Sequence, residues 1–186
     1  MLAHGKQGGT SLVEVLVTIV ITSIGLLGLA GLQSRLQISE VESYQRAQAL
    51  LLLEDMASRI TTNRAAAAAY ATGAGSPLGV GMTCTATDAT STRAQVDSSE
   101  WCVALQGASE VRGANNVGAM LGARGCVQLL PNNDYLLTVT WQGTAPLTAP
   151  PASVNCGQGA YDDGAICTAD RCRRAVTTVL RVASLS

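Results

Sequence analysis

The chemically most distinctive group in this 186-residue chain is a carboxylate inside an apolar run. Between Leu12 and Leu32 the only charged side chain is Glu14. At about 1.5 Å per residue, a helix over this run is roughly 30 Å long, which is the thickness of a bilayer core. A carboxylate near the start of such a helix costs about 2 to 3 kcal/mol in lipid, so Glu14 is a candidate functional residue.

Six cysteines form the second set of reactive groups, and all of them lie C-terminal to the apolar run: Cys84, Cys102, Cys126, Cys156, Cys167 and Cys172. An even number on one side of a membrane segment predicts disulfides and an oxidising compartment. A metal site is the alternative, and Cys167 and Cys172 lie close together in the sequence. Zinc would require a second close cysteine pair or histidines, and the only histidine is His4. Among the possible pairings we expect Cys84 with Cys102, Cys126 with Cys172, and Cys156 with Cys167.

No catalytic arrangement is evident in the remaining polar residues. A Ser-His-Asp or Cys-His site needs a histidine in the mature chain, so we expect no enzyme, no cofactor and no metal. Asp162 and Asp163 are either paired carboxylates for acid–base work or calcium, or part of a solvated turn. Arg171, Arg173 and Arg174 either bind an anion or form a polar strand end.

Size and charge narrow the class of protein further. The chain has room for one membrane helix and one globular domain of about 120 residues. The net charge is −1 and no basic stripe occurs, which argues against a nucleic-acid partner. Phenylalanine is absent and other aromatic residues are few, so the core must be largely aliphatic.

The polar leader at residues 1–9 is too short to be a secretory n-region plus h-region, and no small-x-small site follows the apolar run. A cleavage must therefore precede the apolar run, which stays in the mature protein. The alternative is an ordinary, uncleaved signal anchor. Lys6 before the run and the cysteines after it predict a cytoplasmic N-terminus and a periplasmic C-terminal domain.

The leader and the start of the apolar run resemble the class III signal of type IV pilins, through Gly9-Thr10-Ser11-Leu12-Val13-Glu14. In that family a prepilin peptidase cleaves after the glycine and the new N-terminus is methylated. The resemblance implies cleavage after Gly9, methylation of Thr10, and pairing of Glu14 with the N-terminal amine of a neighbouring subunit. Thr10 stands where the family usually has phenylalanine.

Three later stretches resemble minor pilins of the PilV type: Asn63-Arg64 before an alanine tract, Tyr135–Gln142, and the strand after Cys172-Arg173-Arg174. The resemblance implies a subunit needed for pilus assembly or priming at or near the tip. Its partners would be the prepilin peptidase, other minor pilins, the major pilin, a tip adhesin and the bacterial inner membrane. The assembled protein would lie in a pilus on the cell surface.

Two other functions stay open, a type II secretion pseudopilin and a membrane-anchored periplasmic binding protein. The large cysteine-bearing C-terminal region favours the minor pilin over the pseudopilin, and the missing active site disfavours the third possibility.

The apolar run is expected to continue into an amphipathic helix that reaches the early sixties. Its core face is marked by residues spaced mostly three and four apart: Val41, Tyr44, Leu50, Leu53, Met56, Ala57 and Ile60. Gly25, Gly28 and Gly31 are either close-contact glycines of a membrane helix or a deliberately weak region. The predicted parts are a leader at 1–9, a transmembrane assembly helix at 10–33, its amphipathic continuation at 34–71, and a disulfide-linked periplasmic domain at 72–186.

The C-terminal domain is expected to be a small antiparallel sheet packed on the long helix, which makes the fold class α+β. A capping-box spacing from Asp97 to Glu100 predicts the start of a short helix. Cys126–Leu130 and Tyr135–Gln142 predict a hairpin, and 175–182 predicts a final strand after a Pro- and Gly-rich loop at 143–172. The second hairpin strand is expected to turn one face to the core, namely Tyr135, Leu137, Val139 and Trp141.

Overall fold

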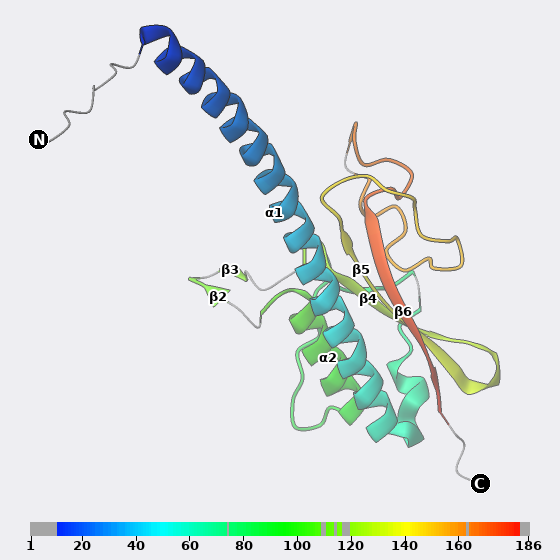
Figure 1. Cartoon of the computed structure of the whole chain (residues 1–186). Helices are drawn as coiled ribbons and strands as arrows, with labels where there is room; N and C mark the ends of the chain where they lie inside the picture. Colours follow the sequence, from blue (N-terminus) through cyan, green and yellow to red (C-terminus); the bar gives the residue numbers. More distant parts are fainter. Residues whose placement is uncertain are drawn as a thin grey trace, which may run out of the picture. The chain divides into compact units, whose positions relative to one another are not determined.

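The computed structural model describes residues 11–73, 75–108, 111–113, 115–116, 120–162 and 164–182. It divides into two compact units, Met1–Val41 and Glu42–Ser186. The long helix α1 (Leu12–Thr62) contributes to both units, and the other elements belong to the second (Figure 1). In order these are the 3-10 helix η1 (Arg64–Tyr70), β1 (Leu78–Gly79), α2 (Arg93–Leu105), β2 (Val111–Arg112), β3 (Asn115–Asn116), β4 (Arg124–Leu129), the 3-10 turn η2 (Pro131–Asn133), β5 (Asp134–Gln142) and β6 (Arg173–Arg181).

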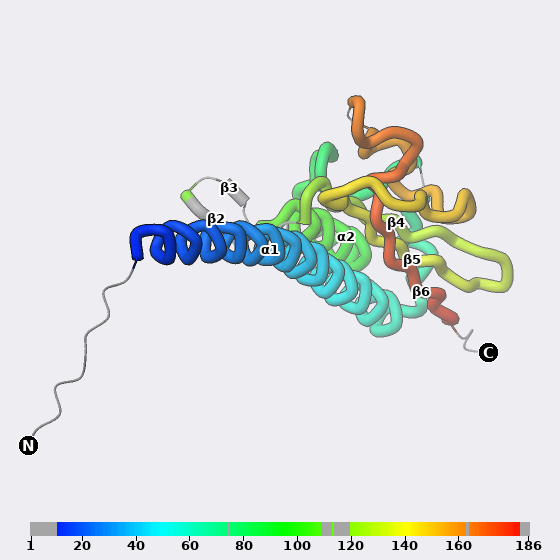
Figure 2. Tube along the Cα trace, turned by 45° about the horizontal axis from the view of Figure 1, so that its top comes forward, coloured from blue at the N-terminus to red at the C-terminus, as the bar shows by residue number. Residues whose placement is uncertain are grey.

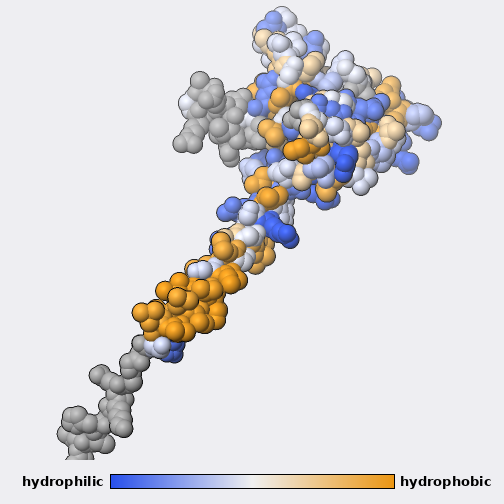
Figure 3. Space-filling model, turned by 90° about the horizontal axis from the view of Figure 1, so that it is seen from above, coloured by the Kyte–Doolittle hydropathy of each residue, from blue (hydrophilic) through white to orange (hydrophobic). Residues whose placement is uncertain are grey.

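The first unit contains the apolar part of α1, and its described side chains are exposed. Leu12 is 82% exposed and Leu27 is 74% exposed, and Figure 3 shows a continuous apolar surface along this part of the helix. The hydroxyl of Ser23 donates to the carbonyl of Ile19 at 2.7 Å, so it is satisfied within the helix. Satisfying hydroxyls in this way suits a helix that must lie in apolar surroundings.

In the second unit α1 buries one face against the head, the globular part of that unit. The buried residues recur at spacings of three and four: Gln45, Ala49, Leu53, Met56 and Ile60. The predicted amphipathic helix is therefore confirmed, but its core face is partly different. Val41, Tyr44 and Leu50 are exposed, because the buried face is aligned with Ala49 and Leu53.

The helix reaches the early sixties, as predicted. It stops at Thr62, and η1 continues the chain with a tighter winding that is interrupted at Ala66, whose φ and ψ are −114° and 24°. Tyr70 at the end of η1 is buried, and its hydroxyl donates to Asp97. The buried Tyr70 side chain therefore ties the end of η1 to α2.

Helix α2 begins before the position predicted from sequence. Its N-cap is Thr92, whose hydroxyl accepts from the Gln95 N–H at 3.3 Å while Gln95 Oε1 accepts from the Thr92 N–H at 2.8 Å. This reciprocal capping box fixes the start, and the similar spacing from Asp97 to Glu100 lies inside the helix. In the cartoon of Figure 1 and the tube of Figure 2, α2 lies beside the second half of α1.

The sheet has the strand order β1-β4-β5-β6, and every neighbouring pair is antiparallel. The predicted hairpin is confirmed as β4 and β5, with Cys126 opposite Thr138. Two residues of η2 adopt a left-handed backbone, Asn132 and Asn133, which closes the connection. The final strand begins two residues earlier than predicted, at Arg173, and pairs with the whole of β5.

The core lies between the sheet, α2 and the second half of α1. The four predicted core residues of β5 are all buried: Tyr135, Leu137, Val139 and Trp141. Trp101 of α2 fills the centre, and its indole N–H donates to the Leu52 carbonyl of α1 at 2.8 Å. The Trp101 ring lies directly over Gly125 of β4, where an added Cβ would overlap it. A residue without a side chain is therefore required at that point of the sheet.

Three disulfides brace the head, and two of them differ from the predicted pairing. Cys84 pairs with Cys102, as expected. Cys126 pairs with Cys156 and Cys167 with Cys172, so the predicted Cys126–Cys172 and Cys156–Cys167 bridges are wrong.

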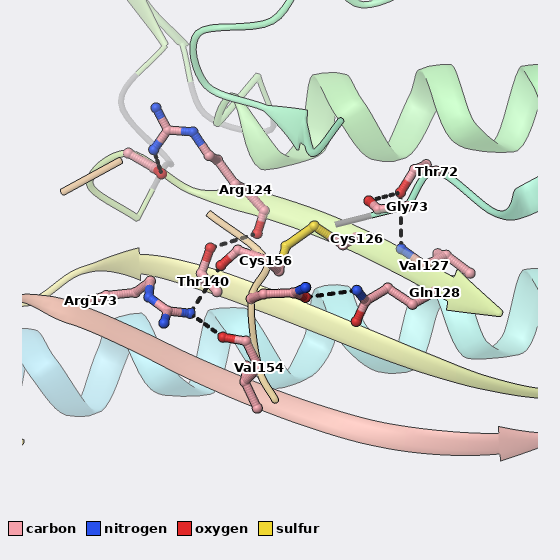
Figure 4. Close-up of a disulfide and its surroundings, with 12 residues drawn as sticks. Thr72, Gly73, Arg124, Cys126, Val127, Gln128, Thr140, Val154, Cys156 and Arg173 are labelled. Atoms are coloured by element: carbon pink, nitrogen blue, oxygen red, sulfur yellow. Dashed lines mark hydrogen bonds between the residues drawn. A yellow bond between two sulfur atoms is a disulfide. The ribbon is translucent and has the colours of Figure 1, made fainter. Parts of the chain in front are cut away.

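The reason for the observed pairing is the path of the 143–172 loop. It crosses the face of the sheet opposite α1 and brings Cys156 over β4 (Figure 4). The hydroxyl of Tyr161 pins this loop by donating to the Gly122 carbonyl at 2.9 Å.

Replacing Gly125 by alanine should destabilise the head by about 1 to 3 kcal/mol, because the new methyl group overlaps Trp101 and the ring must move. The matched control is Gly75→Ala, because a Cβ at Gly75 meets open space and should change stability by less than about 0.5 kcal/mol. Denaturant unfolding of the full chain in detergent, followed by tryptophan fluorescence, measures both. Equal stability of the two variants would contradict the packing described for Trp101.

Candidate assembly site

Glu14 lies in the first turn of α1, where its carboxylate is exposed. The helix starts with the Ser11 carbonyl, which accepts from the N–H groups of Glu14 at 3.0 Å and Val15 at 3.2 Å. A negative charge at a helix N-terminus is favoured by the helix dipole. Among the described residues nothing donates to the Glu14 carboxylate, so within this part of the chain it is available to an intermolecular partner.

The other two residues of the predicted processing site, Gly9 and Thr10, lie outside the described residues. Cleavage after Gly9 and methylation of Thr10 therefore stay predictions. The helix that follows is long and apolar enough to cross a membrane by length and composition. A Cβ added at Gly25, Gly28 or Gly31 would meet nothing within 4 Å, so no described part of the chain packs against these glycines.

A polar clamp, made by Glu42, Thr144 and Arg174, joins α1 to the sheet at the beginning of the second unit. Glu42 Oε1 accepts from the Thr144 N–H at 3.2 Å, the Thr144 hydroxyl at 3.0 Å and the Arg174 guanidinium at 3.1 Å. Arg174 also donates to the Ala145 carbonyl at 2.7 Å. Partial burial raises the pKa of Glu42, but the bonds from Thr144 and Arg174 outweigh it, so the pKa lies below its usual value.

The contacts of Arg173 and Arg174 argue against an anion-binding site at these two residues and favour the polar strand end. Arg173 is buried, and its guanidinium donates to the carbonyls of Val154 at 2.6 Å and Cys156 at 3.1 Å and pairs with Asp170 at 3.2 Å. Arg174 is occupied by the clamp. Both side chains therefore hold the 143–172 loop and are not free to bind an anion.

The contacts of Asp162 argue against the paired-carboxylate hypothesis for residues 162 and 163. Asp162 accepts from the Asp170 N–H at 2.9 Å, and Asp170 accepts from the Gly159 N–H at 2.8 Å. These carboxylates shape the turns of the loop, which favours the turn interpretation. Asp163 lies outside the described residues.

A second polar cluster, which the sequence did not indicate, is centred on the buried carboxylate of Asp97 in α2. It pairs with Arg59 of α1 and with Arg93, each at 2.9 Å, and it accepts from the Tyr70 hydroxyl. Burial lowers the pKa of Arg59, but the bonds to Glu100 and Asp55 raise this pKa by more, so the net change is an increase. Burial and the bond to Asp97 raise the pKa of Tyr70. The cluster ties α1, η1 and α2 together.

With this geometry established, one comparison with known proteins gives a match. Residues 5–30 match the family model of the prokaryotic N-terminal methylation motif. The matched range contains Gly9, Thr10 and Glu14. No curated protein and no solved structure matches the chain.

The motif supports a protein of the type IV pilin and pseudopilin class. A long apolar N-terminal helix with a small antiparallel four-stranded sheet is an α+β arrangement consistent with the pilin fold. The motif implies processing by a prepilin peptidase and assembly with other pilins, and together with the apolar helix it fits anchoring in a membrane.

Replacing Glu42 by glutamine should lower the stability of the head at neutral pH by about 1 kcal/mol or less, since the pair is partly exposed. A carboxylate whose folded pKa is depressed stabilises the fold above its unfolded pKa, near 4.3, and loses that contribution as the pH falls through the folded pKa. The difference between wild type and variant should therefore shrink below about pH 4.

Unfolding of both proteins at pH 7 and pH 3 measures this difference. Glu40→Gln is the matched control, since Glu40 is exposed and lies two residues before the clamp. An equal loss at both pH values would contradict a role for the charged carboxylate.

Proposed function

We propose that this protein is a minor pilin, resembling the PilV type, that is incorporated at or near the tip of a type IV pilus and is needed to start or assemble the fibre. The observation that carries the proposal is the apolar first part of α1, which is exposed and has one carboxylate at its start. Such a surface must be covered by lipid before assembly and by the helices of other subunits afterwards.

Glu14 has the central role in this proposal. A carboxylate that enters a bundle of apolar helices is costly unless a cation accompanies it. The ammonium at a neighbouring subunit's N-terminus would supply that cation and would set the axial position of one subunit on the next. The methylation motif supports this role, because its matched range begins before Gly9 and includes Glu14.

The proposed role of the head is structural. It has no turnover, no cofactor and no nucleic-acid partner, and it presents its surface to other minor pilins, the major pilin or a tip adhesin. Before assembly the chain would cross the inner membrane once, with its N-terminus in the cytoplasm and the head in the periplasm. The three disulfides support an oxidising compartment for the head.

A type II secretion pseudopilin is the second candidate, because the methylation motif is shared by both classes. The disulfide-braced head, with a loop of thirty residues at 143–172, favours the minor pilin. The two candidates differ in which process fails when the protein is lost.

Gly9→Val should block processing, because the peptidase needs a residue without a side chain at the cut. The variant should keep residues 1–9, whereas the wild-type chain should begin at methylated Thr10. The matched control is Gly8→Val, which changes the adjacent glycine and should still be processed. Intact-mass measurement of the membrane-extracted protein distinguishes the products, and a Gly9→Val chain of mature mass would refute the assignment of the site.

Deletion of the protein should reduce surface pili and twitching motility severalfold, while the major pilin held in the inner membrane stays plentiful. The reason is that a tip subunit is needed once per fibre, to begin it. Counting pili by electron microscopy, with the wild-type gene restored in trans as control, measures the effect. Normal piliation with failed protein secretion would identify a pseudopilin, and normal piliation and secretion would favour the periplasmic binding protein.

A further inference from the structure

The smallest of the three disulfide rings lies at the end of the 143–172 loop. Cys167 and Cys172 are 5 positions apart in the sequence, whereas the other two bridges join cysteines 18 and 30 positions apart. A short ring restricts the unfolded chain least, so its bridge contributes least to the stability of the whole head. Opening the Cys167–Cys172 bridge should therefore cost the fold less than opening either of the others.

The backbone inside this small ring is held in an unfavourable conformation. Ala169 has a φ of 53° and Asp170 a φ of 60°, both in the left-handed region. Aspartate tolerates this region, but alanine rarely adopts it, because its Cβ lies too close to a neighbouring carbonyl oxygen. Opening the bridge lets Ala169 return to a favourable conformation. The closed ring is therefore less stable, relative to the two free thiols, than a ring with a relaxed backbone.

The same ring holds the start of the 143–172 loop through its backbone carbonyls. The Gly143 N–H donates to the Cys172 carbonyl at 2.8 Å. The Leu147 N–H donates to the Arg171 carbonyl at 2.8 Å. This carbonyl also accepts from Arg174 of the polar clamp at 3.2 Å. The backbone of the ring therefore fixes the start of the loop beside the clamp.

Asp170, inside the ring, holds the later part of the loop. Its buried carboxylate accepts from the Gly159 N–H at 2.8 Å and pairs with Arg173 at 3.2 Å. Its own N–H donates to the Asp162 carboxylate at 2.9 Å. Arg173 in turn donates to the Val154 carbonyl at 2.6 Å (Figure 4). A change of backbone conformation at Asp170 therefore moves the group to which this part of the loop is attached.

Exposure and backbone strain point to different bridges. Cys84 is partly exposed, whereas Cys167 is only 9% exposed and Cys172 is fully buried. Access determines how fast a thiolate reaches a sulfur atom, but strain in the closed ring shifts the equilibrium between disulfide and thiols. Among the described non-glycine residues between Cys84 and Cys102, none has a positive φ. At equilibrium the Cys167–Cys172 bridge should therefore be reduced first, through attack at the more accessible Cys167.

We propose that the Cys167–Cys172 bridge is a redox-sensitive switch, which a dithiol reductant opens to release the 143–172 loop while the core stays folded. The inference stands on the geometry of the second unit and does not depend on the proposed function.

The reaction is a thiol–disulfide exchange in two steps. A thiolate of the reductant attacks Cys167 Sγ, the Sγ–Sγ bond breaks, and Cys172 leaves as a thiolate. The second thiol of the reductant then attacks the mixed disulfide and releases Cys167. Each cysteine takes up the proton that one reductant thiol has lost. The two cysteines gain two electrons, and the dithiol is oxidised to a disulfide.

The test uses the full chain in detergent micelles, equilibrated with graded ratios of reduced to oxidised dithiothreitol. After an acid quench the free thiols are alkylated, and peptide mass spectrometry reports the open fraction of each bridge. Cys167–Cys172 should be half open at a ratio at least about tenfold lower than either other bridge, because closing it strains Ala169. The tryptophan fluorescence of the head should be unchanged at that ratio, because the core stays folded.

Deuterium exchange tests whether the closed ring holds the loop. When only Cys167–Cys172 is reduced, the amides of Leu147 and Gly159 should exchange at least about tenfold faster, because their acceptors lie on the released ring. The amide of Val139 in β5 is the internal control and should not change. The double variant Cys167→Ala, Cys172→Ala should show the same fast exchange at the two loop amides without any dithiol.

Ala169→Gly relieves the strain, since glycine adopts a positive φ readily, so the bridge should need a ratio at least about threefold higher to open. The matched control is Ala165→Gly, which changes an exposed alanine just outside the ring and should leave the midpoint within about twofold of wild type. An equal midpoint for Ala169→Gly and wild type would show that backbone strain does not set the equilibrium.

Three further results would overturn the proposal. The first is that either of the other two bridges opens at the same ratio as Cys167–Cys172 or at a lower one. The second is unchanged exchange at the Leu147 and Gly159 amides when that bridge is open, which would show that other contacts hold the loop. The third is loss of the folded tryptophan signal at the midpoint, which would show that the ring cannot open without unfolding the core.

Discussion

The first part of α1 has an apolar surface that the described part of the chain does not cover. This surface determines what the molecule requires from its surroundings. The large apolar side chains from Leu12 to Leu32 are between 46% and 82% exposed. An apolar surface of this extent is not stable in water, so lipid or other subunits must cover it. The lone carboxylate of Glu14 gives that surface a polar point at which one subunit can be aligned with another.

The head is a small domain that packs on the second half of the same helix. Trp101 is the largest fully buried side chain between helix and sheet, and it can approach the sheet because residue 125 is glycine. Around this centre the Asp97 cluster, the Glu42 clamp and the three disulfides fix the segments that the core does not reach. The head is thus held by its packed core together with directed polar contacts and disulfides.

Local sequence pattern was sufficient to predict the long helix, the hairpin and the buried face of β5. These features depend on periodicity within one segment, which the sequence displays directly. The predicted start of α2 was wrong because two capping-box spacings follow one another, Thr92 to Gln95 and Asp97 to Glu100. Only the tertiary structure shows that the Asp97 carboxylate binds Arg59 and does not cap the helix.

The remaining errors concern residues whose partners are distant in the chain. The Cys126–Cys156 bridge depends on where a thirty-residue loop crosses the sheet. Arg173 could not be recognised as buried, and the pairing of Glu42 with Arg174 joins residues 132 positions apart. The candidate assembly residues were found from sequence because the motif is contiguous. The left-handed backbone inside the smallest disulfide ring became visible only in the structure.

The exposed apolar helix and Glu14 support our proposal that this chain is a subunit of a filament. The most direct measurement is the distribution of tagged protein between inner membranes and pili sheared from the cell surface. Processed wild-type protein should be found in the sheared fibres at a small fraction of the major pilin. A processed Glu14→Leu variant should stay in the membrane. Wild-type protein confined to the membrane of piliated cells, or equal recovery of both proteins in fibres, would show that Glu14 does not direct this chain into a filament.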